Sequence, residues 1–228
     1  MTIVLIDGSY FVFYRYYATL IWWKHQQKEE NTDNENLHEN KDFVEKFIEL
    51  FEKRLVEIPK KLKIKEPFEM YIAYDCPRSE IWRNGYTENY KATRKNNSDV
   101  GNFFKLVMEK GLFEKPDIIS GTISLDCLEA DDCIALYIKK IHDLYPCKEI
   151  YVITNDHDYL QLKSDNIYLI NLKYQTVGIN KTSGDPQKDL FIKAVCGDKS
   201  DNINKIFINK KLGTKKVGDL YNDLDKFT

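Results

Sequence analysis

The chain has 228 residues, of which 43% are hydrophobic and 13% aromatic, so it can bury a full core as one domain with a small appendage. No apolar run approaches the roughly 18 residues of a membrane span, and no basic region precedes the apolar N-terminal stretch, so neither a membrane span nor a signal peptide is indicated. The net charge of −2 averages over regions of opposite sign. Five scattered cysteines without a CxxC spacing predict core or near-core thiols in an intracellular protein, not a disulfide framework or a zinc site.

Apolar runs and helical periods alternate along the first 172 residues. The predicted strands are residues 2–6, 68–74, 149–154 and 166–172. The predicted helices are residues 10–23, 42–58 (ending before Pro59), 103–112, 129–142 and 187–196, with a last helix near the end of the chain. This alternation predicts an α/β fold with a largely parallel sheet and helices on both faces. Residues 24–41 are polar and aperiodic, which is typical of a flexible insertion.

Carboxylates gather where the predicted strands end and where one helix begins. The groups are Asp7, Asp75, the trio Glu129, Asp131 and Asp132, and the pair Asp156 and Asp158. In an open α/β sheet the carboxyl ends of the strands form the ligand-binding edge, so these groups are predicted to converge there. A further pair, Asp198 and Asp201, lies in the stretch CGDKSDN. Mutually repelling carboxylates are costly unless a hard cation such as magnesium or manganese neutralises them, so we predict a metal site.

Simpler roles for the same acids stay open. A helix N-terminus favours carboxylates, so capping alone would explain the trio at residues 129–132 if it stood by itself. A turn or cap role likewise remains possible for Asp7.

Two basic regions flank the acids in sequence. Residues 76–115 hold eight Lys or Arg against five Asp or Glu, and residues 199–216 hold six Lys against Asp201 alone. A solvated surface would explain either run, whereas basic segments around a metal site suit a polyanionic substrate. Residues 81–97 interleave three aromatic side chains with basic ones, which favours contact with a single strand over an ordinary exposed helix. The interleaved residues are Trp82, Arg83, Tyr86, Tyr90, Lys91, Arg94 and Lys95.

With these residues in view, the chain resembles the 5′-nuclease family, which includes bacterial and bacteriophage flap endonucleases and the 5′-3′ exonuclease domain of bacterial DNA polymerase I. Five ordered motifs carry the resemblance: LIDGSY, ENYKATR, LEADD, TNDHDYLQL and GDKSDNI. The resemblance implies a PIN-like nuclease domain over residues 1–185 with a helical arch at about 76–115. It also implies a helix-three-turn-helix over residues 186–228, expected to be incomplete at its C-terminal end.

The resemblance further implies roles for particular residues. The implied metal-binding carboxylates are Asp7, Asp75, Glu129, Asp131, Asp132, Asp156, Asp158, Asp198 and Asp201. The implied catalytic cations are Lys91, Arg94 and Arg83, and the implied substrate-binding residues are Tyr90, Lys205, Lys215 and Lys216. Two or more Mg2+ or Mn2+ ions are expected, with a K+ ion at the helix-three-turn-helix. Two features depart from the family pattern: the stretch NKIFINKKLGTKK that overlaps the end of GDKSDNI contains only Gly213 where the family typically has several glycines, and the insertion at 24–41 has no counterpart.

The resulting functional hypothesis is two-metal hydrolysis of DNA at a free 5′ end, flap or single-strand/duplex junction, by a monomer acting in replication or repair. Two cations can activate water and stabilise the leaving oxygen, which accounts for many carboxylates without a Ser/His or Cys/His nucleophile. An RNA-directed nuclease of the same fold is the main alternative, because reading of the 2′-OH depends on geometry. A non-catalytic nucleic-acid-binding or scaffold protein is a further alternative. An aspartyl-phosphate phosphatase is excluded, because no second Asp stands two positions after Asp7.

Overall fold

Five parallel strands form the centre of the molecule. The computed structural model describes residues 1–27, 36–65, 67–87, 90–92, 98–114, 117–178, 182–206 and 212–223. The strands are β1 (Thr2–Asp7), β2 (Phe68–Ala73), β3 (Gly121–Ile123), β4 (Ile150–Ile153) and β5 (Ile167–Ile170). The α-helices are α1 (Gly8–Gln27), α2 (Lys41–Lys61), α3 (Ser98–Glu109), α4 (Ala130–Leu144), α5 (Pro186–Cys196) and α6 (Thr214–Asp223). Short 3-10 helices are η1 (Leu37–Glu39), η2 (Arg78–Glu80), η3 (Trp82–Gly85) and η4 (Asp158–Leu162).

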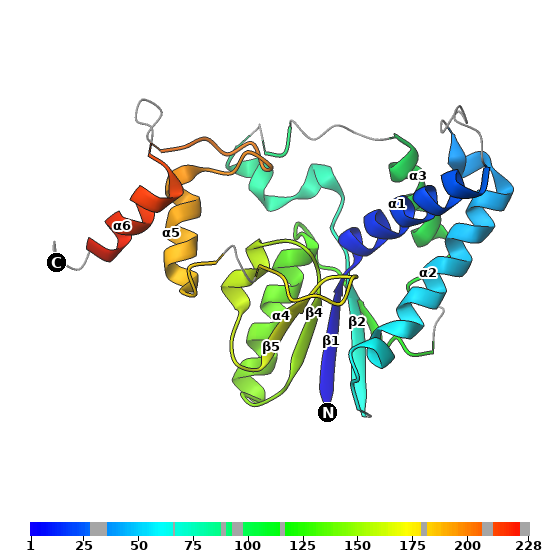
Figure 1. Ribbon diagram of the computed structural model, residues 1–228, viewed down its shortest axis with the longest axis horizontal. Helices are drawn as coiled ribbons and strands as arrows, with labels where there is room; N and C mark the ends of the chain where they lie inside the picture. Colours follow the sequence, from blue (N-terminus) through cyan, green and yellow to red (C-terminus); the bar gives the residue numbers. More distant parts are fainter. Residues whose placement is uncertain are drawn as a thin grey trace.

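The strand order creates a crevice at the carboxyl edge of the sheet. Hydrogen-bonded neighbours follow the order β3-β2-β1-β4-β5, and every pair is parallel. The chain first builds outward from β1 to β3 and then returns through α4 to place β4 on the other side of β1 (Figure 1). Ligands of such sheets bind where the strand order reverses, which here is the gap between the ends of β1 and β4. Asp7 ends β1 and Thr154 directly follows β4, so both stand at this point.

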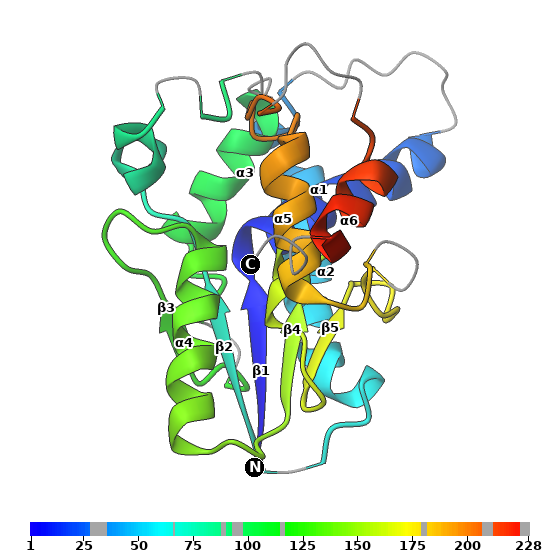
Figure 2. The same ribbon diagram turned by 90° about the vertical axis from the view of Figure 1, so that its left-hand side faces the viewer.

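Both faces of the sheet are covered by helices. Val4 and Ile6 of β1 face a core shared with α1, α2 and α3, whereas Ile3 and Leu5 face a second core shared with α4 (Figures 1 and 2). This arrangement explains why β1 is a continuous apolar run, since a strand buried on both faces needs no polar alternation. Among the described residues, no helix combines the length and apolar character needed to cross a bilayer.

The predicted α/β fold with helices on both faces is confirmed, and two elements differ from prediction. The strand β3 was not predicted, because it has three residues that are all only half-buried and thus gives no periodic signal. The helix α2 does not stop before Pro59 but continues to Lys61. Burial of Ile58 and Pro59 offsets the backbone hydrogen bond that proline cannot donate, and the Leu62 N–H closes the helix on the Ile58 carbonyl at 3.0 Å.

The insertion at 24–41 is partly ordered, which corrects the expectation of a flexible segment for its described residues. Helix α1 extends to Gln27, and η1 buries Leu37, while residues 28–35 lie outside the described part of the chain. His38 anchors η1 on the buried Asp99 of α3, with 2.9 Å between Nδ1 and Oδ1. The Tyr16 hydroxyl donates to the other oxygen of Asp99 at 2.6 Å. One buried carboxylate therefore joins α1, the insertion and the first turn of α3.

The cysteines also differ in part from prediction. All five are free thiols, and Cys76 and Cys133 are buried as expected. Cys127 and Cys147 are instead exposed, because each lies in a loop next to one end of α4 rather than on an apolar face.

Candidate metal centre

Asp7 is held at the crevice by three donors from different segments. Its side chain is 9% exposed, and its Oδ1 accepts a hydrogen bond of 2.9 Å from the Tyr10 N–H in the first turn of α1. Its Oδ2 accepts from the hydroxyls of Thr154 and Tyr159, both at 3.3 Å. Thr154 and Tyr159 were not predicted as site residues, although both lie in the motif TNDHDYLQL. The Asp7 carboxylate is thus fixed in position by donors from α1, from the residue after β4 and from η4.

The electrostatics of Asp7 show that the predicted acids converge. Burial is the largest influence and raises the pKa of Asp7 to about 7, against the opposing effect of the Tyr10 N–H. The charges of Asp75, Asp131 and Asp156 raise this pKa further. Acids from four separate segments therefore lie close enough to repel one another at the carboxyl edge of the sheet, as the strand-end pattern predicted.

The raised pKa of Asp7 predicts that this side chain destabilises the folded protein more at high pH than at low pH. Between the ordinary value of 3.8 and the folded value of about 7, the folded protein holds a proton that the unfolded chain has released, so stability falls as pH rises through this window. In metal-free buffer with EDTA we expect Asp7→Asn to exceed wild type in stability by about 4 kcal/mol at pH 8 and by less than about 1 kcal/mol at pH 4, since one pKa unit corresponds to about 1.4 kcal/mol. Urea unfolding at both pH values measures the difference, and a difference independent of pH would contradict the prediction.

The first carboxylate cluster comprises Glu129, Asp131 and Asp132, which can place one oxygen each within 4.8 Å of the others. Burial, followed by the charge of Asp132, raises the pKa of Asp131 to about 6. The capping role is also realised in part, because Asp132 Oδ2 accepts from the Glu129 N–H at 3.2 Å. Asp75 joins the cluster by accepting from the Ala130 N–H at 2.7 Å. The start of α4 therefore fixes four carboxylates, and capping uses only some of their oxygens.

Two cations from the predicted arch lie on this cluster. Arg83 donates to both oxygens of Asp132, at 2.6 and 2.8 Å, and its Nη1 lies 3.0 Å from Glu129. The Lys91 ammonium lies 2.5 Å from Glu129 Oε1. Glu129 is only 4% exposed, so its charge requires such partners. The structure thus places Arg83 and Lys91, two of the predicted cations, in direct contact with the predicted metal-binding acids.

Other arch residues are placed differently from expectation. Tyr90 is 7% exposed, and its hydroxyl donates to Glu129 at 2.7 Å, so its ring is not an open stacking surface. Burial in a small apolar cluster and this hydrogen bond together explain the correction. Tyr86 is instead 84% exposed and Trp82 is 44% exposed. The described arch contains η2 and η3, and Arg94 lies outside the described residues.

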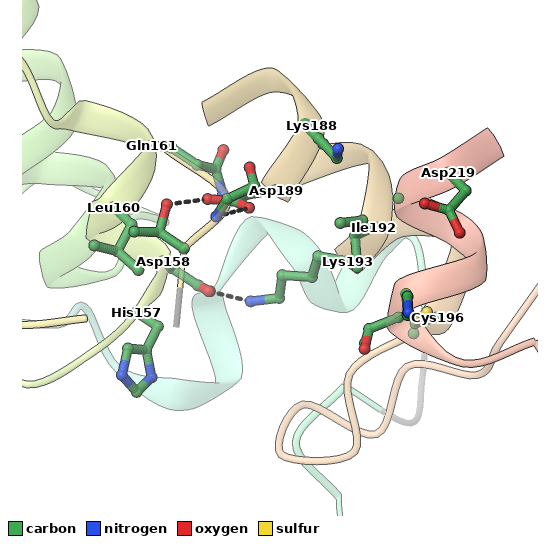
Figure 3. A pocket seen from close by; sticks show the side chains of 16 residues that line it. His157, Asp158, Leu160, Gln161, Lys188, Asp189, Ile192, Lys193, Cys196 and Asp219 are labelled. Atoms are coloured by element: carbon green, nitrogen blue, oxygen red, sulfur yellow. Dashed lines mark hydrogen bonds and ion pairs between the residues drawn. The ribbon is translucent and has the colours of Figure 1, made fainter. Parts of the chain in front are cut away.

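The second carboxylate cluster joins distant parts of the chain. Asp158 from η4 and Asp198 and Asp201 from the loop after α5 can also place one oxygen each within 4.8 Å of the others. Lys193 of α5 contacts Asp158 (Figure 3). Its ammonium also lies 2.9 Å from Asp198. Although burial opposes the shift, hydrogen bonds from Ser200 and Lys193 lower the pKa of Asp198 to about 2. Lys193 was not predicted, and its position one helical turn before the motif GDKSDNI is the available signal.

The two clusters are linked through the backbone. The Lys91 N–H donates to the Asp201 carbonyl at 3.0 Å, so the arch and the loop after α5 lie side by side. An open cavity of about 680 Å³ lies beside the second cluster, lined by η4, α5 and α6 (Figure 3). Lys205, Lys215 and Lys216 are exposed and do not contact either cluster among the described residues. Lys205 and the first turn of α6 therefore lie outside both clusters.

The ligand atoms of both clusters favour one class of metal ion. Both clusters offer carboxylate oxygens alone, without the sulfur or imidazole ligands that favour zinc or copper. Hard divalent cations such as Mg2+ and Mn2+ are the ions that such oxygen sets suit. The residues present therefore fit the metals that the sequence predicted.

Comparisons with known proteins agree with this geometry. A family model described as the 5′-3′ exonuclease, N-terminal resolvase-like domain, matches residues 2–186. A protein named 5′-3′ exonuclease from Mycoplasmopsis pulmonis (strain UAB CTIP) is 28% identical over 235 residues, covering 98% of this chain and 68% of that protein.

Solved structures from bacteriophage T5 share the fold. A T5 protein co-crystallised with metal ions has a TM-score of 0.67 at 18% identity, and a T5 flap endonuclease complex with DNA and metal ions has 0.64 at 17% identity. Each comparison covers 98% of this chain and 75% of the T5 chain. At these identities the likeness shows the fold alone, and that fold is the one described above. Because the family model spans most of its length, the chain belongs to the 5′-3′ exonuclease family, as the five motifs predicted.

Proposed function

We propose that this chain is a divalent-metal-dependent nuclease that hydrolyses DNA phosphodiesters at a free 5′ end or flap. The observation that carries the proposal is the pair of all-carboxylate clusters at one edge of the sheet, each already in contact with cationic side chains. A relative named 5′-3′ exonuclease and a T5 flap endonuclease of the same fold that binds DNA and metal ions support the choice of substrate.

The carboxylates are proposed to hold two or more Mg2+ or Mn2+ ions. When bound, such ions lower the pKa of a water molecule and stabilise the leaving oxygen of an in-line displacement. The proposed ligands are Asp7, Asp75, Glu129, Asp131, Asp132, Asp156, Asp158, Asp198 and Asp201. A K+ ion at a helix-three-turn-helix formed by residues 186–228, the division at residue 185 and a monomeric state stay predictions.

The basic residues are proposed to hold the scissile phosphate beside the acids. Arg83 and Lys91 are paired with Asp132 and Glu129, and a substrate phosphate offers the same cations an alternative anionic partner. A side chain that moves from carboxylate to phosphate places its positive charge where negative charge grows during hydrolysis. Arg94 is proposed to assist Lys91, and exposed Tyr86 and Trp82 offer stacking faces to an unpaired strand.

A labelled substrate assay tests the proposed function directly. We expect cleavage of a 5′-flap DNA near the junction in Mg2+, no cleavage in EDTA, and much slower cleavage of the matched RNA. Faster cleavage of the RNA would favour an RNA-directed nuclease of the same fold. Binding of either strand without cleavage in Mg2+ and in Mn2+ would overturn the assignment and favour a nucleic-acid-binding protein.

The start of α6 is proposed to bind the duplex backbone without base preference. Lys215 and Lys216 are exposed in its first turn, where free N–H groups also favour phosphate. We expect Lys215→Ala with Lys216→Ala to reduce the slope of log K against log salt by about 2, since each lost contact contributes about 0.9.

Helix α4 offers a matched control for this prediction. Lys139→Ala with Lys140→Ala removes two exposed lysines from the C-terminal half of α4, away from the helix end that carries the first cluster, and should leave the slope unchanged. Equal slopes for wild type and the Lys215/Lys216 variant would show that α6 does not grip duplex.

A further inference from the structure

Two arginines outside the carboxylate clusters are incompletely hydrogen-bonded. Among the described residues, two buried side-chain nitrogens have no hydrogen-bond partner, and they are Nε of Arg15 and Nε of Arg54. Arg15 lies on α1 and is only 7% exposed, and in the described part of the chain its guanidinium has no ion-pair partner either. A buried N–H donor without an acceptor is costly, so each of these two nitrogens requires an explanation.

Arg54 of α2 adds a second positive charge at the same place. Its Nη1 lies 3.3 Å from the Tyr174 hydroxyl and 3.4 Å from Glu57, and its Nη2 lies 3.2 Å from the Leu172 carbonyl. Burial is the main cause that lowers the pKa of Arg15, and the charge of Arg54 lowers it further. The Glu57 carboxylate opposes this shift, and among the described residues its ion pair is with Arg54.

Charge and hydrogen-bond capacity both point to a missing anion. Glu57 pairs with Arg54, so among the described residues the charge of Arg15 has no ion-pair partner, and the Nε–H donors of both arginines lack acceptors. An oxyanion with several acceptor oxygens satisfies both deficits, since guanidinium groups bind phosphate in a bidentate fashion. We propose that Arg15 and Arg54 form a binding site for a phosphate oxyanion, supplied by a nucleic-acid strand that reaches the carboxylate edge.

The position along α1 favours a strand as the source of this phosphate. Arg15 follows Asp7 by eight residues, which corresponds to roughly 12 Å along a helix axis. Leu172 and Tyr174 contact Arg54. The Leu172 N–H also donates to the hydroxyl of Tyr10, in the first turn of α1, at 3.0 Å. Phosphates of one strand recur about every 3.4 Å of duplex axis, so a strand held at the acids reaches Arg15 within a few nucleotides. The choice of strand rests on the proposed nuclease function, whereas the oxyanion chemistry does not.

Arginine Nε–H resonances of the wild-type protein test the site without a variant. The chain has five arginines, so few such signals need assignment. In EDTA, inorganic phosphate titrated against chloride at matched ionic strength is expected to shift the Nε–H signals of Arg15 and Arg54 and to leave that of Arg78 unchanged. An oligothymidylate that produces the same shifts at lower phosphate concentration identifies a strand as the ligand. Shifts with inorganic phosphate alone retain the site but overturn the strand as its source, and no shift with either probe overturns the site.

Arg15→Met provides the second test, because it keeps the apolar stem and removes the donors. We expect phosphate to bind this variant at least about tenfold more weakly, as judged from the Arg54 signal, and Arg15→Lys to retain part of the affinity. Lys53→Met, an exposed neighbour on α2, is the matched control and should bind phosphate as wild type does. Full phosphate affinity in Arg15→Met would overturn the proposal. These measurements use no cleavage, so their failure is distinct from a failure of the nuclease assignment.

Discussion

Replacing Asp131 by Asn is expected to lower the rate of DNA cleavage by about 10³-fold or more, with affinity for DNA nearly unchanged. Asp131 is part of the first carboxylate cluster, and burial together with the Asp132 charge holds its pKa near 6. Asn fills the same space without negative charge, so it weakens cation binding while preserving the packing at the start of α4. Single-turnover cleavage and equilibrium binding in EDTA measure the two quantities separately, and Asp156→Asn is expected to behave alike.

The control for this prediction lies on the same helix. Asp143 is exposed near the C-terminal end of α4, away from the sheet edge that carries the clusters, so Asp143→Asn should cleave as wild type does. Excess EDTA should abolish cleavage by wild type, and undiminished turnover there would rule out metal dependence altogether.

Lys91→Ala is expected to slow single-turnover cleavage by about 10²–10³-fold and to weaken substrate binding by much less. The Lys91 ammonium lies against the buried Glu129, at the point where phosphate and carboxylates would meet. A cation in this place matters most when negative charge grows on the phosphate, so its removal acts chiefly on the transition state.

Lys105→Ala, an exposed change on α3, is the matched control and should alter neither quantity. Urea unfolding of Lys91→Ala is needed alongside, since the change leaves Glu129 with one cationic partner fewer. Equal losses in binding and in rate would make Lys91 an ordinary phosphate contact.

The sheet and the gathering of acids were predictable because both follow from local patterns. Each main strand is an apolar run followed by an acid or polar turn, and parallel strands place such ends at one edge. Asp7 and Asp156 could therefore be assigned to one place although 149 positions separate them in the chain. The start of α4 was equally clear, since the acids at 129–132 directly precede an apolar period.

The remaining features depend on contacts between distant segments, which no local pattern encodes. His38 belongs to a polar stretch and becomes ordered only because Asp99 is buried across from it. Tyr90 looked like an exposed aromatic among lysines, yet its hydroxyl reaches Glu129 and its ring turns inward. Lys193 lies on a helix of weak amphipathic pattern, and its contacts with Asp158 and Asp198 arise from tertiary packing alone. Contacts of this kind form only in the folded protein, so the sequence gives no local sign of them.

The second carboxylate cluster combines residues from both sides of the boundary of the matched family domain. The matched family domain ends at residue 186, yet Asp198 and Asp201 follow that boundary and meet Asp158 from within it. A fragment that stops at the boundary keeps the whole sheet but only one of these three carboxylates. A chimera joined there takes Asp158 from one parent and Asp198 and Asp201 from the other, so the second cluster combines side chains of both. Any cut that preserves the site has to fall after Asp201.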